Sequence, residues 1–214
     1  VSHDIKEPLT SLKLSVALAR MDKLTQDEFR SISAELDNHL DRTTEFIQNL
    51  LQWAKFQLRG ESINLVSFNI NQLIDEVISV MSHGARQKGI SIVREATESE
   101  LIVKADIVMI QSVVRNLISN AIKFSPVGGT ITLVAQELAE GAAQVSVQDA
   151  GVGIARISHD KIFTLENVAT KGTRSESGTG LGLVLCREFV EKNSGKIWFE
   201  SVEGKGTSFH FSLP

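Results

Sequence analysis

The sequence predicts an α+β protein in two parts, an N-terminal antiparallel helical hairpin followed by an α/β sandwich. Up to about residue 58, apolar residues recur at three- and four-residue spacing, which is typical of amphipathic helices. Farther along, short alternating stretches typical of strands are interspersed with helical patterns, which favours helices on one face of a mixed sheet. Arg59–Ser62 interrupts the helical periodicity. We therefore expect two domains, residues 1–60 and residues 61–214.

Composition indicates a soluble globular chain and argues against nucleic acids and membranes as its partners. Of the 214 residues, 42% are hydrophobic and 22% are charged. The net charge of −4 argues against a nucleic-acid binder, which usually carries a basic excess. No apolar run reaches the ~20 residues of a membrane span, so no membrane contact is expected within this segment. The single Cys186 favours a cytoplasmic protein or, because the chain opens in mid-pattern without Met, the cytoplasmic part of a membrane-anchored one.

The hairpin is expected to consist of a helix over residues 1–21, kinked at Pro8, and a longer helix that ends near residue 58. Thr25, with Glu28 three residues later, forms a capping box that would start the second helix. Apolar residues of that helix stand in heptad register, and the first helix is too short to cover them all. We therefore expect a homodimer in which two hairpins form a four-helix bundle.

The second part is expected to contain both strands and helices. Asp106 is suited to cap one helix, and Pro126, Gly128 and Gly129 to turn the chain after it. The stretch 158–177, rich in Thr, Gly and Ser, is predicted to be a mobile loop. We expect strands over residues 65–70, 90–94, 101–104, 131–136, 144–148, 196–200 and 207–213, and helices over residues 71–88, 106–124 and 179–193.

The helix predicted over residues 106–124 carries a polar stripe. Asn116, Asn120 and Lys123 fall at i, i+4 and i+7 and share one face, whereas apolar residues occupy the other side. A solvated face is one interpretation. The other is ligand binding, because amide oxygens suit a hard cation such as Mg²⁺ and an ammonium suits phosphate.

A carboxylate followed by spaced glycines ends one predicted strand. Asp149 directly follows residues 144–148 and precedes Gly151 and Gly153. Glycines let the backbone line a pocket closely, and the carboxylate can accept a hydrogen bond from an exocyclic amine such as adenine N6. A turn that uses Asp and Gly for backbone reasons alone is the alternative.

A glycine-rich stretch precedes the last helical pattern. Gly178, Gly180 and Gly182 alternate with Thr179 and Leu181. Glycine lets backbone amides approach an anion, and a helix N-terminus adds partial positive charge. The stretch lacks the Lys-Ser or Lys-Thr of a Walker loop and the preceding strand of a dinucleotide fingerprint. Phosphate binding and a plain glycine-rich turn both remain open for it.

His3 and Asp4 form a candidate nucleophile and base. Lone histidines are usually satisfied surface or core residues. Here the ring is expected on the outer side of the first helix, beside a carboxylate. A neighbouring carboxylate can orient the imidazole and take up its proton, which makes the other ring nitrogen a nucleophile.

Together these stretches resemble the catalytic core of the sensor histidine kinases of two-component signalling. His3–Leu9 resembles the family's phosphoacceptor box, Asn116–Ser125 its asparagine box and Asp149–Ile154 its first glycine box. Lys161–Phe163 resembles the phenylalanine box, and Gly178–Leu183 the second glycine box. All five occur in the family's order across nearly the whole chain. The second domain would then be a sandwich of the histidine-kinase, Hsp90 and gyrase ATPase class.

The resemblance implies phosphorylation of His3 at a ring nitrogen by ATP, with Asp4 as general base. The phosphoryl group would then pass to an aspartate on a response-regulator receiver domain docked on the helical hairpin. Asn120, assisted by Asn116, would ligate Mg²⁺, and Lys123 would pair with phosphate oxygens.

The resemblance also implies an adenine pocket and a lid over the phosphates. Asp149 would bind adenine N6, Gly151 and Gly153 would keep the pocket wall thin, and Phe124 would lie against the base. The second glycine box would give the lid its hinge and its phosphate-binding amides, through Gly178, Thr179, Gly180, Leu181 and Gly182.

Two positions depart from the family pattern. Glu7 stands four residues after the histidine, where phosphatase-competent members often carry Thr, Asn or Gln, and this puts phosphatase activity in doubt. The box around Phe163 lacks a second aromatic residue, which weakens the lid assignments. Lys171 and Arg174 are the candidates for a side-chain contact between the lid and phosphate.

Two other functions are compatible with the same sandwich. A conformational clamp of the gyrase, chaperone or mismatch-repair kind would need a glutamate that activates water near the asparagine helix. Here Arg115 precedes Asn116, and the nearest upstream acid, Asp106, is almost three turns away. An ATP-sensing scaffold would bind ATP without phosphotransfer, although no motif residue needed for transfer is missing. The signal, the cognate regulator, and phosphorylation within or between protomers stay open.

Overall fold

The computed structural model describes most of the second part of the chain and isolated positions of the first. The described residues are 63–95, 100–138, 141–164, 172–173 and 180–214, with Thr25, Gln26, Glu28, Arg30, Ser33, Thr44 and Ile47. His3, Asp4, Glu7, Lys171, Arg174, Gly178 and Thr179 lie outside them, as do most of the expected hairpin and its boundary at residues 59–62.

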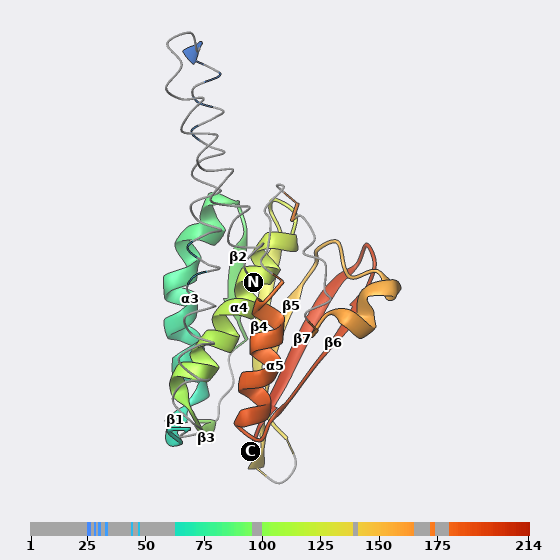
Figure 1. Ribbon diagram of the computed structural model, residues 1–214. Helices are drawn as coiled ribbons and strands as arrows, with labels where there is room; N and C mark the ends of the chain where they lie inside the picture. The colour runs from blue at the N-terminus through green and yellow to red at the C-terminus, as the bar shows by residue number, and fades with distance from the viewer. Residues whose placement is uncertain are drawn as a thin grey trace.

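A five-stranded mixed sheet forms one layer of the described chain (Figure 1). Only the pairing of β2 with β4 is parallel, and the other neighbours are antiparallel. The strands lie in the order β2 (Ser91–Arg94), β4 (Thr130–Glu137), β5 (Ala143–Asp149), β7 (Gly206–Leu213) and β6 (Lys196–Val202).

Three helices form the second layer on one face of this sheet (Figure 1). A separate two-stranded ribbon pairs β1 (Val66–Asn69) with β3 (Ile102–Ala105). The helices are α3 (Ile70–Gln87), α4 (Ile107–Phe124) and α5 (Gly182–Lys192). The expected α+β sandwich, with helices on one face of a mixed sheet, is therefore confirmed.

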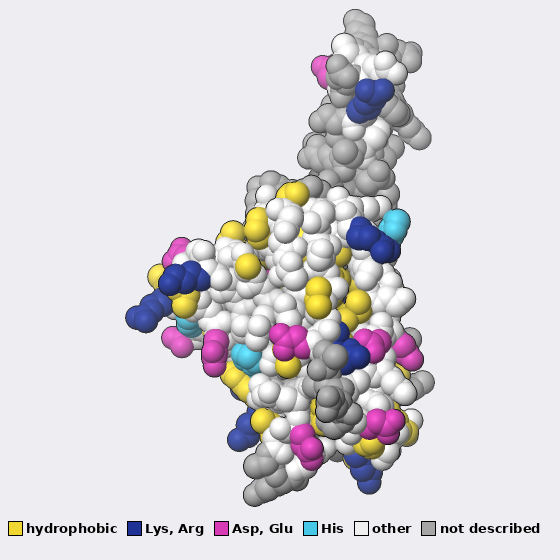
Figure 2. All heavy atoms as spheres, turned by 180° about the vertical axis from the view of Figure 1, so that it is seen from behind, with side chains coloured by type: hydrophobic (Ala, Val, Ile, Leu, Met, Phe, Trp, Pro, Cys, Tyr) yellow, Lys and Arg dark blue, Asp and Glu magenta, His cyan; other side chains and the backbone are white. Residues whose placement is uncertain are grey.

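The core lies between the helices and the covered face of the sheet. Alternate residues of the strands, such as Leu133, Val145 and Phe211, are fully buried there. The helix α4 lies between α3 and α5 and is buried along one side. None of the described helices covers the opposite face of the sheet, and Figure 2 shows hydrophobic, acidic and basic side chains interspersed on that side. Because the apolar side of α4 is buried in this core, its polar residues lie on the remaining side of the helix.

Two helix starts confirm the expected capping residues. Asp106 caps α4, because its Oδ1 accepts the N–H groups of Val108 and Met109 at 3.1 and 3.2 Å. Near the start of the chain, the N–H of Thr25 donates to Glu28 Oε2 at 2.8 Å. The N–H of Glu28 donates to Thr25 Oγ1 at 3.3 Å, which completes a capping box.

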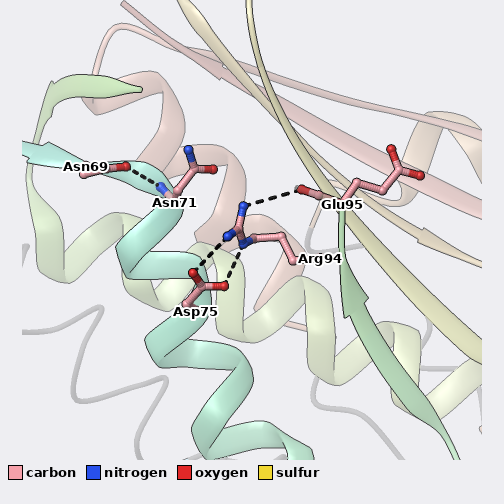
Figure 3. Close-up of polar contacts among 5 residues, drawn as sticks. All are labelled: Asn69, Asn71, Asp75, Arg94 and Glu95. Carbon is pink, nitrogen blue, oxygen red and sulfur yellow. Dashed lines mark hydrogen bonds and ion pairs between the residues drawn. The ribbon is translucent and has the colours of Figure 1, made fainter. Parts of the chain in front are cut away.

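A bidentate ion pair joins the edge strand β2 to α3 (Figure 3). Arg94 donates from Nε to Asp75 Oδ1 at 2.6 Å and from Nη2 to Asp75 Oδ2 at 3.1 Å. At the start of the same helix, Asn69 Oδ1 accepts the N–H of Asn71 at 2.9 Å and caps it. The parallel edge strand is thus held to the helix that leads into it.

Two sequence-based expectations were wrong in detail. The last helix begins at Gly182 and not at Thr179, because Gly180 has φ +70° and cannot continue a right-handed helix. The stretch expected to be a mobile loop starts with a 3-10 helix, η2 (Arg156–Lys161), and then buries Ile162 at 5% exposure. Phe163 packs on Phe199, with ring centroids 5.9 Å apart.

In the part of the chain that is described, no helix combines the length and apolarity that crossing a bilayer requires.

Candidate active site

The polar stripe of α4 leads towards the helix end, where the site is built. Asn116, Asn120, Lys123 and Phe124 are all partly buried, on a helix whose other side is core. The ammonium of Lys123 lies 4.7 Å from the ring centroid of Phe124, a cation–π distance. The last turns of α4 therefore present two amides, one cation and one aromatic ring.

Asp149 lies at the end of β5 with its carboxylate in a largely desolvated position. Oδ1 accepts the N–H of Gly151 at 2.8 Å. Burial raises the pKa of Asp149, and the backbone N–H groups of Gly151 and Thr207 oppose this rise. A partly buried carboxylate held from one side is suited to accept a hydrogen bond from a ligand on the other.

The loop after Asp149 packs directly on the end of α4. A Cβ on Gly151 would overlap the carbonyl oxygen of Phe124, so only glycine permits this approach. The N–H of Val152 donates to the same carbonyl at 3.3 Å. Gly153, at φ +69°, passes against Val202 of β6. The two motifs, far apart in the sequence, thus form one wall.

The start of α5 lies against Asn116. A Cβ on Gly182 would be 3.1 Å from Asn116 Oδ1. Leu181 occupies the N-cap position and makes no side-chain cap. The N-terminus of α5, whose partial positive charge favours anions, therefore lies beside the polar stripe.

The structure thus brings together most of the predicted site residues that it describes. The loop after β5 lies against the end of α4, and the start of α5 lies against Asn116, about two turns earlier on the same helix. His3, Asp4, Gly178, Thr179, Lys171 and Arg174 lie outside the described residues, so their place relative to this site stays a prediction.

Three residues at this site escaped the sequence analysis. Lys88 donates to carbonyls at the end of α4, Thr173 donates to the carbonyls of Lys123 and Ser125, and the N–H of Thr207 faces Asp149. Each acts through backbone groups, which leave no pattern in a sequence. The only available signal was the Lys-Gly pair that ends the helix before β2.

Comparison with known families accounts for this arrangement. Residues 105–214 match the family described as histidine kinase-, DNA gyrase B-, and HSP90-like ATPase. Residues 1–59 match the His Kinase A (phospho-acceptor) domain. The chain therefore belongs to the histidine kinase-, DNA gyrase B- and HSP90-like ATPases, and among them to the sensor histidine kinases. The match over residues 105–214 supports the use of ATP by this domain.

Curated relatives share the whole length of this chain. The sensor histidine kinase WalK of Bacillus subtilis (strain 168) is 32% identical over 219 residues, which cover 100% of this chain and 35% of WalK. The adaptive-response sensory kinase SasA of Microcystis aeruginosa is 30% identical over 220 residues, which cover 100% of this chain and 57% of SasA. The chain thus spans only part of each relative.

Solved structures share the fold. The catalytic domain of histidine kinase ThkA is 34% identical, with a TM-score of 0.62, over 71% of this chain and 95% of that domain. Histidine kinase ThkA in complex with response regulator protein TrrA is 26% identical, with a TM-score of 0.74, over 100% of this chain and 59% of that one.

Proposed function

We propose that this protein phosphorylates itself on His3 with ATP and passes the phosphoryl group to an aspartate of a response-regulator receiver domain. The observation that carries the proposal is the meeting of three segments at one site: the polar stripe of α4, the loop after Asp149 and the start of α5. Each offers a different chemistry, and together these suit the base and the phosphates of one nucleotide.

Adenine is the part of the substrate that the end of β5 would hold. Asp149 would accept a hydrogen bond from the exocyclic amine at N6. Gly151 keeps the adjoining wall free of side-chain atoms, as its close approach to Phe124 supports. The ring of Phe124, half-buried beside this wall, would contact the base.

Mg²⁺ and the phosphates fit the polar stripe. Among the described residues, no group of three or more His, Cys, Asp or Glu could hold a metal alone. The ion would take the amide oxygens of Asn120 and Asn116 together with phosphate oxygens, because amide oxygens suit a hard cation, and it would supply charge neutralisation. Lys123 and the first amides of α5 would bind the remaining phosphate charge.

The transfer itself would need little covalent work from the ATP-binding domain. A ring nitrogen of His3 forms a bond to the γ-phosphorus, the bond to the β–γ bridging oxygen breaks, and ADP leaves. Asp4 accepts the imidazole proton. Because residues 1–59 match the phospho-acceptor domain, we further propose two domains, over residues 1–60 and 61–214, and dimerisation through the first. We also propose that the protein acts in the cytoplasm, where ATP is available.

The test is labelling with γ-labelled ATP and Mg²⁺, beside a His3→Ala control. We expect label that is labile to acid and stable to alkali, absent from the control, and transferable to a receiver domain. Label on the control would overturn the assignment of His3. ATP binding without any label, also when the chain is extended upstream, would favour an ATP-sensing scaffold instead.

A further inference from the structure

Four consecutive carbonyl groups at the end of α4 are each held by a donor from another part of the chain. The carbonyl of Ile122 accepts from Lys88 Nζ, and that of Phe124 from the N–H of Val152. Those of Lys123 and Ser125 both accept from Thr173. A helix leaves its last carbonyls without partners inside the helix, and here tertiary contacts supply all of them.

Lys88 is an unusual donor for this task. The residue is only 5% exposed. Lysine is rarely buried unless its ammonium group has partners. Nζ donates to the carbonyls of Ile122 and Lys123, both at 2.7 Å. An ammonium at the C-terminal end of a helix also interacts favourably with the helix dipole. These contacts direct the charge of Lys88 to the backbone of α4.

Thr173, which follows α4 in the chain, donates to the carbonyl of Lys123 as Lys88 does. Its N–H donates to the carbonyl of Lys123 at 3.1 Å. Its Oγ1 lies 3.2 Å from that carbonyl and 2.8 Å from the carbonyl of Ser125. The carbonyl of Lys123 is therefore shared by donors from the turn after α3 and from the segment between η2 and α5.

We propose that Lys88 and Thr173 are positioning residues for the nucleotide. They fix the last turn of α4, and thereby the Lys123 ammonium and the Phe124 ring, without touching the ligand. The inference rests on the proposed function of this turn in binding ATP. It assigns two residues outside the recognisable motifs to the affinity for nucleotide.

The decisive comparison is Thr173→Val with Thr173→Ser, because both keep the backbone N–H and only serine keeps the hydroxyl. We measure the dissociation constant for ATP with Mg²⁺ and the melting temperature without nucleotide, on the full chain. Thr173→Val should raise the dissociation constant about 3- to 10-fold, the factor carried by one neutral hydrogen bond. Thr173→Ser should stay within about twofold, because its hydroxyl restores the bond.

Thr164→Val is the matched control. Thr164 Oγ1 donates to the carbonyl of Lys161 at 2.9 Å, so the variant removes a similar bond at the end of η2 instead of α4. It should leave the dissociation constant within about twofold, because the hydrogen bond that it removes is at the end of η2 and not at the end of α4. A merely structural role of Thr173 would lower the melting temperature and leave the affinity unchanged.

Lys88→Met adds an independent arm. It keeps the length of the stem and removes the charge, and the KM for ATP should rise while kcat at saturation changes little. Because Lys88 and Thr173 share one acceptor, the double variant with Thr173→Val should be non-additive. If Lys88→Met fails to fold, the comparison of Thr173→Val with Thr173→Ser still tests the inference.

Unchanged affinity in Thr173→Val, or equal losses in Thr173→Val and Thr173→Ser, would overturn the inference while the proposed function stands. If the unaltered protein binds no ATP, the proposed function itself fails and this inference with it.

Discussion

Gly182, the first residue of α5, faces the side-chain amide of Asn116 on α4, and a Cβ there would stand 3.1 Å from the amide oxygen. Two motifs separated by about sixty residues of sequence thus meet in van der Waals contact. The gap left by the missing side chain sets how closely the start of α5 approaches the polar stripe. The neighbouring amide favours glycine here, and not the φ of Gly182, which is not in the left-handed region.

Gly182→Ala tests this contact. The added methyl must displace the Asn116 amide by a few tenths of an ångström, while alanine is favourable in a helix. We expect the melting temperature without nucleotide to hold or rise, and the rate of His3 labelling to fall about tenfold, as misplaced ligands commonly cause. Differential scanning fluorimetry and initial labelling rates measure the two effects. A variant that labels at the normal rate would contradict the close-approach argument.

Asp149→Asn should separate stability from binding. Burial raises the pKa of Asp149, so this carboxyl favours folding fully below its unfolded pKa, and that contribution is lost as pH rises through the folded pKa. At neutral pH the ionised group therefore opposes folding, and asparagine removes this cost.

We expect the nucleotide-free variant to melt no lower than the unaltered protein at pH 7, and its stability to vary less between pH 4 and pH 7. With Oδ1 held by Gly151, the amide nitrogen would face the adenine amine, donor against donor. ATP affinity should fall about 10- to 100-fold, the range of a hydrogen bond to a charged group. Calorimetric titration and melting curves measure these effects, and unchanged affinity would remove Asp149 from the adenine pocket.

His210 should make stability depend on pH away from the site. Its side chain is 9% exposed, with Nδ1 2.7 Å from Ser146 Oγ and the ring stacked on Trp198. Burial lowers the pKa of His210, and the charge of Glu200 opposes this shift. A lowered folded pKa gives stability that is present above the unfolded pKa, about 6.5, and is lost as pH falls through the folded pKa.

We therefore expect the melting temperature to fall between pH 7 and pH 5, and His210→Gln to reduce that slope. The variant changes the uncovered face of the sheet, so ATP affinity at pH 7.5 should stay the same. An identical pH slope in the variant would show that another group titrates.

Metal removal tests the role of the amides. Chelation with EDTA should abolish labelling of His3, and Asn120→Ala should reduce it about 100-fold or more even with Mg²⁺ present, because the phosphates keep their charge without the ion. Gln111→Ala, on an exposed position of the same helix, is the matched control and should label normally. Full labelling by Asn120→Ala would assign the metal to other ligands.

The sequence predicted α4 well because several local signals agree there. Asp106 is a strong cap, the apolar stripe has helical spacing, and the polar residues fall on the remaining face. The mobile loop predicted over residues 158–177 was wrong in its first part, because composition averages over a window, whereas the buried Ile162 and the partly buried Phe163 pack against the core.

Contacts of the main chain were beyond prediction. Lys88 looks like an ordinary lysine at a helix end, and nothing in its neighbours indicates two carbonyl partners more than thirty positions away. Thr173 lies in a polar stretch with several hydroxyl residues, and the sequence does not indicate which of them donates to α4. Both roles depend on where α4 ends in space, which follows from packing and not from local pattern.

The place of β7 has a consequence for how the protein is made. This strand comes after β5 and β6 in the chain, yet it pairs between them and brings Thr207 against Asp149. In a growing polypeptide that has reached only β6, the edges of β5 and β6 that β7 later joins are unpaired, and Thr207 is not yet beside Asp149. On the proposed function, the protein would therefore bind ATP only after β7 has been synthesised and has paired between β5 and β6.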